Sequence, residues 1–484
     1  MSAASAPDRI DAYVWRVGAV VLVGSMMSIL DTTIVNVAVA TLGRELHAAI
    51  TNIQWVITGY MLALAAVIPI TGWAGRRFGA KQIYLISLVL FTVGSALCGL
   101  ATSTTELIVF RVLQGIGGGM TLPIGQQMMA EAAGPKRMGR VMSILAVPVM
   151  LAPILGPTIG GVILQNISWR WIFYVNVPIG VVAFFSGMRV LPRVKPQPTD
   201  SLDVRGLLLM ATGLPLLTYG LAEIGVTGSF TSVKVVVPIL LGLGLVAMFV
   251  LHALHARRPL LDLRLYRRST FSAASVAMFC LAAALFGAMI LVPLYWQDVR
   301  HESVIATGLL MAPQGLGAAV VMPLAGKLTD RVGGGPLALL GVVLTAVMTI
   351  PFGLVGAHTS VVWLSAVMFL RGTGIGFGFM PAMAAAFAAL EHSELSDATP
   401  QMNVLQRVGG SIGTAVLAVV LQRALAGVHT LAAAAGAYGV AFWASAILAA
   451  TAIVPCMILM RAEREARAES ATQASDAAAE AALA

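Results

Sequence analysis

Apolar runs of about 20 residues recur along almost the whole chain, and short polar segments separate them. A run of that length is what an α-helix needs to cross the hydrocarbon core of a bilayer. The polar segments between the runs leave little room for a soluble domain. The pattern therefore predicts an all-α integral membrane protein in which the membrane-spanning helices are nearly the whole molecule.

We expect fourteen spans, and their limits follow from the apolar runs: 15–37, 51–70, 82–101, 105–129, 138–163, 170–191, 204–223, 234–256, 271–294, 304–325, 336–357, 360–385, 402–425 and 436–460.

The composition supports a membrane protein. The chain has 484 residues, of which 58% are hydrophobic and 11% are charged. Soluble domains carry about 25% charged residues, so a soluble fold is excluded. The first apolar run lacks a small-residue cleavage site followed by a soluble chain, so we interpret it as a retained span and not as a signal peptide.

Basic residues are concentrated in alternate loops. Examples are the clusters Arg76, Arg77, Lys81 and Arg257, Arg258, Arg264, Arg267, Arg268. Loops rich in Lys and Arg remain in the cytoplasm, so we expect both termini to be cytoplasmic. The net charge of +9 then reflects this asymmetry and the anionic leaflet that it faces, and we expect no nucleic-acid partner.

The three cysteines predict neither a disulfide nor a metal site. Cys98, Cys280 and Cys456 all lie in apolar runs, where a free thiol behaves as a small hydrophobic group. No His, Asp or Glu residues accompany them at the spacing of metal ligands. We expect no metal and no cofactor.

Two stretches of the chain have a similar counterpart later in the sequence. Pro69–Gln82 and Pro323–Pro336 lie 254 residues apart and share a proline, two glycines and an arginine at matching positions. Phe110–Met120 likewise resembles Phe369–Met380. Internal repeats in transporters indicate two helical bundles with a substrate site between them. Eight spans separate the first copy from the second, whereas two plain six-span halves would give six.

The two extra spans therefore lie between the halves. The chain then divides into a six-helix bundle over 1–200, two additional helices over 201–262, a second six-helix bundle over 263–460 and a charged cytoplasmic tail over 461–484, to which we assign no chemistry.

Asp31 is the one charged residue within Val17–Val39. A carboxylate at that depth is costly unless it pairs or takes up a proton, so it indicates an ion or substrate pathway. Counted from Arg16 it lies about 22 Å into the membrane, and Arg111 on the descending fourth span reaches a matching depth about 8 Å below the external surface. Arginine stays protonated, so Asp31 is the member of this pair that can carry a proton. The alternative is a structural carboxylate bonded to a neighbouring helix.

Five polar or aromatic residues in the first, second and fourth spans are candidates for contact with substrate: Asn36, Gln54, Trp55, Tyr60 and Gln114. Aromatic faces suit flat lipophilic or cationic ligands. Trp55 also fits the aromatic belt expected at a membrane interface, which is the alternative for that residue.

Five motifs resemble one known family. They are LDTTIVNVAVATL (Leu30–Leu42), GWAGRRFGAK (Gly72–Lys81), RVLQGIGGGM (Arg111–Met120), LGPTIGG (Leu155–Gly161) and WRWIFYVNVPIG (Trp169–Gly180). In this order they are similar to the major facilitator superfamily, in its fourteen-span drug:proton antiporter branch of the EmrB/QacA type. The resemblance implies the major facilitator fold, with two six-helix bundles and two extra central helices.

The resemblance also implies roles for several residues. Gating and antiporter motifs correspond to Gly72, Arg77, Gly79, Gly156, Pro157, Gly160, Gly161, Asp330 and Arg331, and proton coupling falls on Asp31 and Arg111. The glycines have a simpler alternative role, which is to let helices approach closely. The chain departs from the family at Arg76, where an acid is usual, so we expect the acid–base latch of the first half to be absent.

These features together predict a proton-coupled multidrug efflux transporter that exports lipophilic or cationic compounds by alternating access. No Walker loop is present, and we expect a secondary transporter and not an enzyme. Two alternatives stay open: a dedicated exporter of an endogenous antibiotic, siderophore or lipid, and an uncoupled lipid-handling or sensory protein.

The expected partners are small-molecule substrates, protons and the lipid bilayer of the inner (cytoplasmic) membrane, which the chain crosses many times. An adaptor protein for passage through an outer membrane is an open alternative, and otherwise we expect a monomer.

Overall fold

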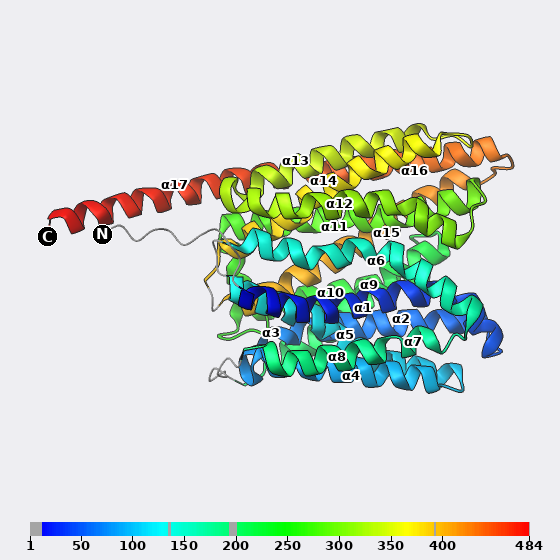
Figure 1. Ribbon diagram of the computed structural model, residues 1–484, viewed down its shortest axis with the longest axis horizontal. Helices are drawn as coiled ribbons and strands as arrows, with labels where there is room; N and C mark the ends of the chain where they lie inside the picture. Colours follow the sequence, from blue (N-terminus) through cyan, green and yellow to red (C-terminus); the bar gives the residue numbers. More distant parts are fainter. Residues whose placement is uncertain (1–11, 134–136, 193–200, 392–393, 484) are drawn as a thin grey trace.

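The structure is a computed structural model that describes residues 12–133, 137–192, 201–391 and 394–483. Long helices lie side by side along the long axis of the molecule (Figure 1). Their bounds are α1 Ala12–Glu45, α2 Ile50–Val67, α3 Thr71–Phe78, α4 Ala80–Leu100, α5 Thr104–Ala133, α6 Met138–Asn166, α7 Trp171–Tyr174, α8 Asn176–Val190, α9 Val204–Thr227, α10 Val233–His255, α11 Ser269–Leu294, α12 Val304–Val332, α13 Gly334–Thr349, α14 Val361–Ala388, α15 Leu395–Leu425, α16 Leu431–Thr451 and α17 Ile453–Leu483.

The predicted spans are confirmed as helices. Thirteen helical stretches in the described part of the chain are long and apolar enough to cross a membrane. Several side chains of α6 lie outside the described residues, and this helix of 29 residues occupies the place of the fifth predicted span. The protein is an all-helical, multi-pass integral membrane protein.

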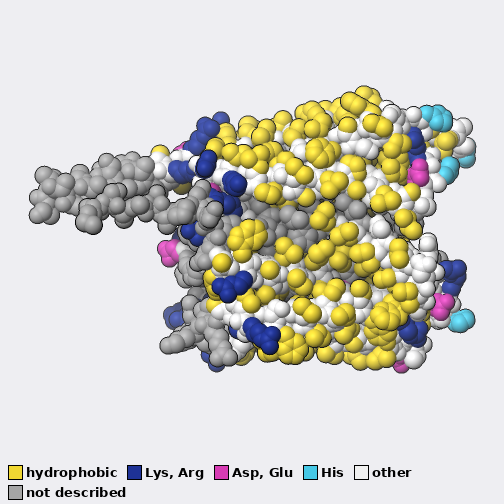
Figure 2. Space-filling model, in the orientation of Figure 1, with side chains coloured by type: hydrophobic (Ala, Val, Ile, Leu, Met, Phe, Trp, Pro, Cys, Tyr) yellow, Lys and Arg dark blue, Asp and Glu magenta, His cyan; other side chains and the backbone are white. Residues whose placement is uncertain are grey.

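The outer surface is apolar between two charged ends. Hydrophobic side chains cover the middle of the molecule, and Lys and Arg side chains gather toward its ends (Figure 2). Large apolar residues are widely exposed there, such as Val320 at 65% and Leu240 at 63%. Ala12 and the last turns of α17 lie at the same end of the molecule (Figure 1), which we call the terminal end. We call the opposite end the distal end.

Two groups of helices make up most of the molecule, and the pair α9 and α10 lies along the seam between them. The first group is α1–α8 and the second is α11–α17, and they meet where α6 packs against α12 and where α15 packs against α3 and α5. Helix α9 packs against both α2 and α15, and α10 packs on α9. The ring of Trp55 on α2 stacks on Tyr219 of α9 with a centroid distance of 5.8 Å. Helix α9 therefore covers a seam between the two groups.

The internal repeat is visible in the backbone. Gly79 lies between α3 and α4 with φ of +91°, and Gly333 lies between α12 and α13 with φ of +111°. These two glycines are 254 residues apart, the spacing of the sequence repeat. A positive φ is costly for residues with a Cβ atom, which explains why both copies use glycine at this turn.

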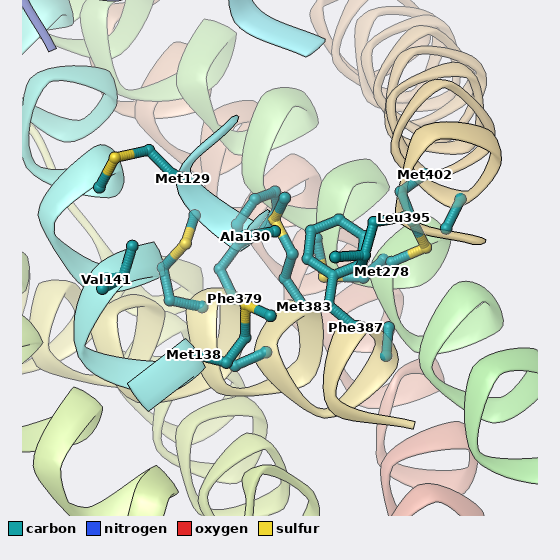
Figure 3. Close-up of a cluster of buried hydrophobic side chains, with 14 of the residues drawn as sticks. Met129, Ala130, Met138, Val141, Met278, Phe379, Met383, Phe387, Leu395 and Met402 are labelled. Atoms are coloured by element: carbon teal, nitrogen blue, oxygen red, sulfur yellow. The ribbon is translucent and has the colours of Figure 1, made fainter. Parts of the chain in front are cut away.

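An apolar core joins the two groups toward the terminal end. Met129 on α5 and Met138 on α6 belong to the same cluster as Phe379 and Met383 on α14 and Met402 on α15 (Figure 3). Methionine side chains are flexible and fill irregular gaps well. This core therefore adapts to the contact between helices from both halves of the chain.

The charged tail makes a defined contact. Helix α17 continues into it, and the Glu463 carboxylate accepts hydrogen bonds from the backbone N–H groups of Gly334 at 3.0 Å and Gly335 at 2.7 Å. The first N–H groups of a helix have no partner within the helix. Glu463 therefore caps the start of α13, a role that the sequence did not reveal.

Candidate functional site

Asp31 and Arg111 form an ion pair inside the first group of helices. Arg111 donates a hydrogen bond from Nη1 to Asp31 Oδ2 over 2.5 Å, and the exposed fractions of the side chains are 1% for Arg111 and 0% for Asp31. The predicted pairing of these two residues is therefore present. Helices α1 and α5 bring them together from positions 80 residues apart in the sequence.

Two amides complete the hydrogen bonding of the carboxylate. Gln114 Nε2 and Asn176 Nδ2 each donate to Asp31 Oδ1 over 2.9 Å, and both side chains are buried. Arg111 is held in turn by the Val56 carbonyl, which accepts from its Nε at 3.2 Å. A buried charge is tolerable only when it is paired and hydrogen-bonded in this way.

Tyr60 links this network to the centre of the molecule. The Arg111 guanidinium lies 4.0 Å from the centroid of the Tyr60 ring, and the Tyr60 hydroxyl lies 3.2 Å from Ser28 Oγ. Ser28 lines the central cavity. Tyr60 and Ser28 therefore connect the ion pair to the cavity.

The cavity has a volume of about 410 Å³ and lies between the two groups of helices. Its lining is mostly apolar and combines methionine and phenylalanine with a few polar side chains. Two of the polar lining residues meet across the groups, because Asn403 Nδ2 of α15 donates to Gln126 Oε1 of α5 over 2.7 Å. A cavity of this size and character suits a small amphipathic molecule.

The five candidate substrate residues lie outside the lining of this cavity. Tyr60 and Gln114 are buried in the Asp31 network, whereas Asn36, Gln54 and Trp55 are exposed. Asn36 follows Ser28 and Thr32 at helical spacing on α1, so it continues the cavity face one turn toward the distal end. Contact between these five residues and substrate stays a prediction.

Two further residues of the site were missed in the sequence. Asn176 lies in the motif Trp169–Gly180, but a neutral amide in an apolar run does not by itself indicate a functional site. Arg407 lines the cavity from α15. It lies inside the predicted span 402–425, which also holds Arg423 near its end, so a search for charged residues within apolar runs would have found Arg407.

Two ion pairs join the groups of helices at the terminal end. Arg76 of α3 donates to Asp397 of α15 at 2.5 Å, and Arg140 of α6 donates to Asp330 of α12 at 3.0 Å. The expectation that the first half lacks an acid–base latch was wrong. The acid is supplied by α15 of the other group, and this could not be deduced from the loop motif alone.

The two latches are related by the repeat with their charges exchanged. Arg76 and Asp330 are 254 residues apart and occupy equivalent positions, so the motif supplies the base in one latch and the acid in the other. Asp330 also accepts the backbone N–H of Gly139 at 2.9 Å. Each latch therefore ties a motif residue to the first turns of a helix in the opposite group.

The motif glycines lie at close helix contacts. A Cβ atom on Gly72 would meet the Ser396 carbonyl oxygen of α15, and Cβ atoms on Gly156 and Gly160 would meet Thr33 and Ile34 of α1. Gly161 instead faces Ile305 of α12, so it is the glycine of this motif that lies against the second group.

The Pro157 side chain is outside the described residues. Arg77 and Arg331 are exposed.

No metal centre is evident in the described part of the chain, where no group of three or more His, Cys, Asp or Glu residues comes together. Cys98, Cys280 and Cys456 are all free thiols.

The comparisons with known proteins agree on one family. A model described as Major Facilitator Superfamily matches residues 21–414. The chain is 39% identical over 420 residues to the multidrug resistance protein B homolog of Mycobacterium tuberculosis, which covers 86% of this chain and 78% of that protein. It is 30% identical to the multidrug export protein EmrB of Haemophilus influenzae, covering 81% and 77% of the two chains. The solved proton:xylose symporter XylE matches in fold, with a TM-score of 0.62, 14% identity and coverage of 92% and 95%.

Proposed function

Because this chain belongs to the Major Facilitator Superfamily, whose members are transporters and not enzymes, we propose that it is a proton-coupled multidrug efflux transporter of the inner membrane. The observation that carries the proposal is the buried Asp31–Arg111 pair, which Tyr60 and Ser28 connect to an apolar cavity of about 410 Å³. The names of the similar multidrug proteins give independent support for efflux.

The latches support a direction of access. We infer from the basic loops that the terminal end faces the cytoplasm. Arg76–Asp397 and Arg140–Asp330 close that end, so the cavity in this state is cut off from the cytoplasm. Opening toward the cytoplasm requires both pairs to separate, and the two groups of helices, α1–α8 and α11–α17, then rock about the cavity.

Asp31 is the group that we propose to carry the proton. Arg111 remains charged, so only the carboxylate can change its charge within this pair. Protonation of Asp31 removes the attraction that holds Arg111 Nη1 and leaves the guanidinium held by the Val56 carbonyl and the Tyr60 ring. Tyr60 contacts Ser28, so a shift of this kind reaches the cavity face of α1.

The test is transport in proteoliposomes with an imposed pH gradient and a lipophilic dye. Asp31→Asn should abolish gradient-driven transport. It also leaves Arg111 buried without a carboxylate, which costs about 3–5 kcal/mol of stability. The matched variant is therefore the double substitution Asp31→Asn with Arg111→Gln, which removes both charges and should restore folding but not coupling.

Gradient-driven transport by the folded double variant at the wild-type rate would rule out Asp31 as the proton carrier. Exchange of dye without a gradient provides the control for an intact cavity, because it needs alternating access but no net proton movement.

A further inference from the structure

The central cavity carries a positive charge that no carboxylate balances in the described part of the chain. Arg407 lies about 18 Å along α15 from Leu395, which places it near the middle of the membrane. Arg407 donates a hydrogen bond from Nη1 to the Met61 sulfur over 3.7 Å. Among the described residues that line the cavity, none is Asp or Glu.

A second arginine adds to this charge. Arg371 of α14 is buried and donates to Thr349 Oγ1 at 3.0 Å and to Gln314 Oε1 at 2.5 Å. Gln314 lines the cavity, so it connects this arginine to the ligand space. The repeat relates Arg371 to Arg111, but Arg111 has the Asp31 carboxylate and Arg371 has two neutral partners.

The buried charges near the cavity therefore differ between the two groups of helices. The first group of helices contributes a neutral ion pair, and the second group contributes two cations with neutral partners. Arginine keeps its proton in proteins, so both side chains stay charged although burial of a charge is unfavourable. Charged residues at this depth mark substrate pathways, and the planar guanidinium matches a carboxylate in geometry.

Gln406, the neighbour of Arg407, also has a buried Nε2 donor for which the described residues offer no acceptor.

Resting on the transport function proposed above, we propose that the cavity binds amphipathic organic anions. The acidic group of the ligand pairs with Arg407, and its apolar body packs against the methionine and phenylalanine side chains of the lining, such as Met289, Met311 and Phe379. A cationic ligand would be repelled by both arginines with no lining carboxylate to hold it. The sequence had suggested lipophilic or cationic compounds, and the charges of the cavity favour anions over cations.

The test compares three probes of equal size: 4-(1-pyrenyl)butanoate, its neutral primary amide and 4-(1-pyrenyl)butylammonium. Their binding to the purified full chain in phosphatidylcholine nanodiscs is followed by pyrene fluorescence. The butanoate should bind about tenfold more tightly than the amide, and the ammonium should bind most weakly. Arg407→Gln should bring the butanoate to the level of the amide, and Arg407→Lys should keep part of the preference.

Arg423→Gln is the matched control, because Arg423 is exposed on the same helix toward its distal end and is not part of the cavity lining. This variant should bind all three probes as the wild type does. If Arg407→Gln does not fold, the probe ranking of the wild type and the Arg407→Lys variant still decide the question.

Equal binding of the three probes, tighter binding of the ammonium, or no binding at all would overturn the anion proposal. Proton-driven transport of the dye by the same preparation decides the proposed function separately. A repeat with phosphatidylglycerol in the nanodisc identifies the natural source of the anion: displacement of the butanoate supports the anion site and assigns it to a lipid headgroup, and retention supports a free amphipathic acid.

Discussion

Burying Asp31 as an isolated charge at bilayer depth would cost several kcal/mol of free energy. The ion pair and the hydrogen bonds of its neighbours offset this cost. Arg111 neutralises the charge, while Gln114 and Asn176 satisfy the remaining oxygen. The sequence predicted the ion pair because Asp31 and Arg111 lie at matching depth in apolar helices, where opposite charges are stable only when they are paired. It did not predict Asn176, because a neutral amide can be satisfied in many ways and its depth does not identify a partner.

Asn176→Ala tests the contribution of this amide. The substitution removes a hydrogen bond to a buried carboxylate, and we expect a loss of about 1.5–3 kcal/mol in stability, measured by thermal unfolding in detergent. Asn166 is the matched control, since it is exposed and bonds only to the Val162 carbonyl within α6 in the described structure. Equal and small effects of the two alanine substitutions would show that Asn176 does not stabilise the charge.

At the scale of the helix, α9 and α10 are joined by one carboxylate. Asp203 caps the start of α9 through the Gly206 N–H at 2.9 Å, and it also binds His252 of α10 at 2.9 Å and the Leu260 N–H at 3.0 Å. Burial raises the pKa of Asp203, but these hydrogen bonds outweigh it and hold the pKa below its ordinary value of 3.8. The two extra helices were predicted from the span count, whereas this cap was not.

Asp203→Asn should therefore weaken the contact between α9 and α10. A carboxylate with a lowered pKa stabilises the fold above its ordinary pKa, and this stabilisation is lost as the pH falls through the lowered value. We expect the variant to lose about 1–3 kcal/mol at neutral pH, seen as faster hydrogen exchange at the end of α10. The difference from the wild type should persist at pH 5 and shrink below about pH 3.8. A difference that disappeared already at pH 6 would show that the Asp203 carboxylate is not the group that stabilises this contact.

At the scale of the whole molecule, the two latches with exchanged charges hold the terminal end closed. The repeat in the sequence showed that the motif occurs twice, but the motif alone suggested a missing acid in the first copy. Asp397 and Arg140 supply the partners from the opposite groups of helices, and such contacts between distant helices depend on the packed structure. The closed state of this molecule is therefore a property of the assembled halves.

Removing the latches should shift the whole population toward a state open at the terminal end. Each pair is partly buried, so its loss costs the closed state about 1–2 kcal/mol. The two sites share no partner, and their effects should nearly add. Asp330→Asn with Asp397→Asn should thus raise the open fraction about 30-fold or more, since 1.4 kcal/mol corresponds to a factor of ten.

The measurement is the labelling rate of a cysteine placed at Thr414 in the cavity, in a background without Cys98, Cys280 and Cys456, by a membrane-impermeant thiol reagent added from the terminal side. The charge exchange Arg76→Asp with Asp397→Arg rebuilds one latch with the polarity of the other, so it should label slowly, whereas Arg76→Asp alone should label fast. If the exchanged pair labelled as fast as the single variant, the ion pair itself would not hold the gate, and closure would rest on the contact of Gly72 with α15 and on the methionine core.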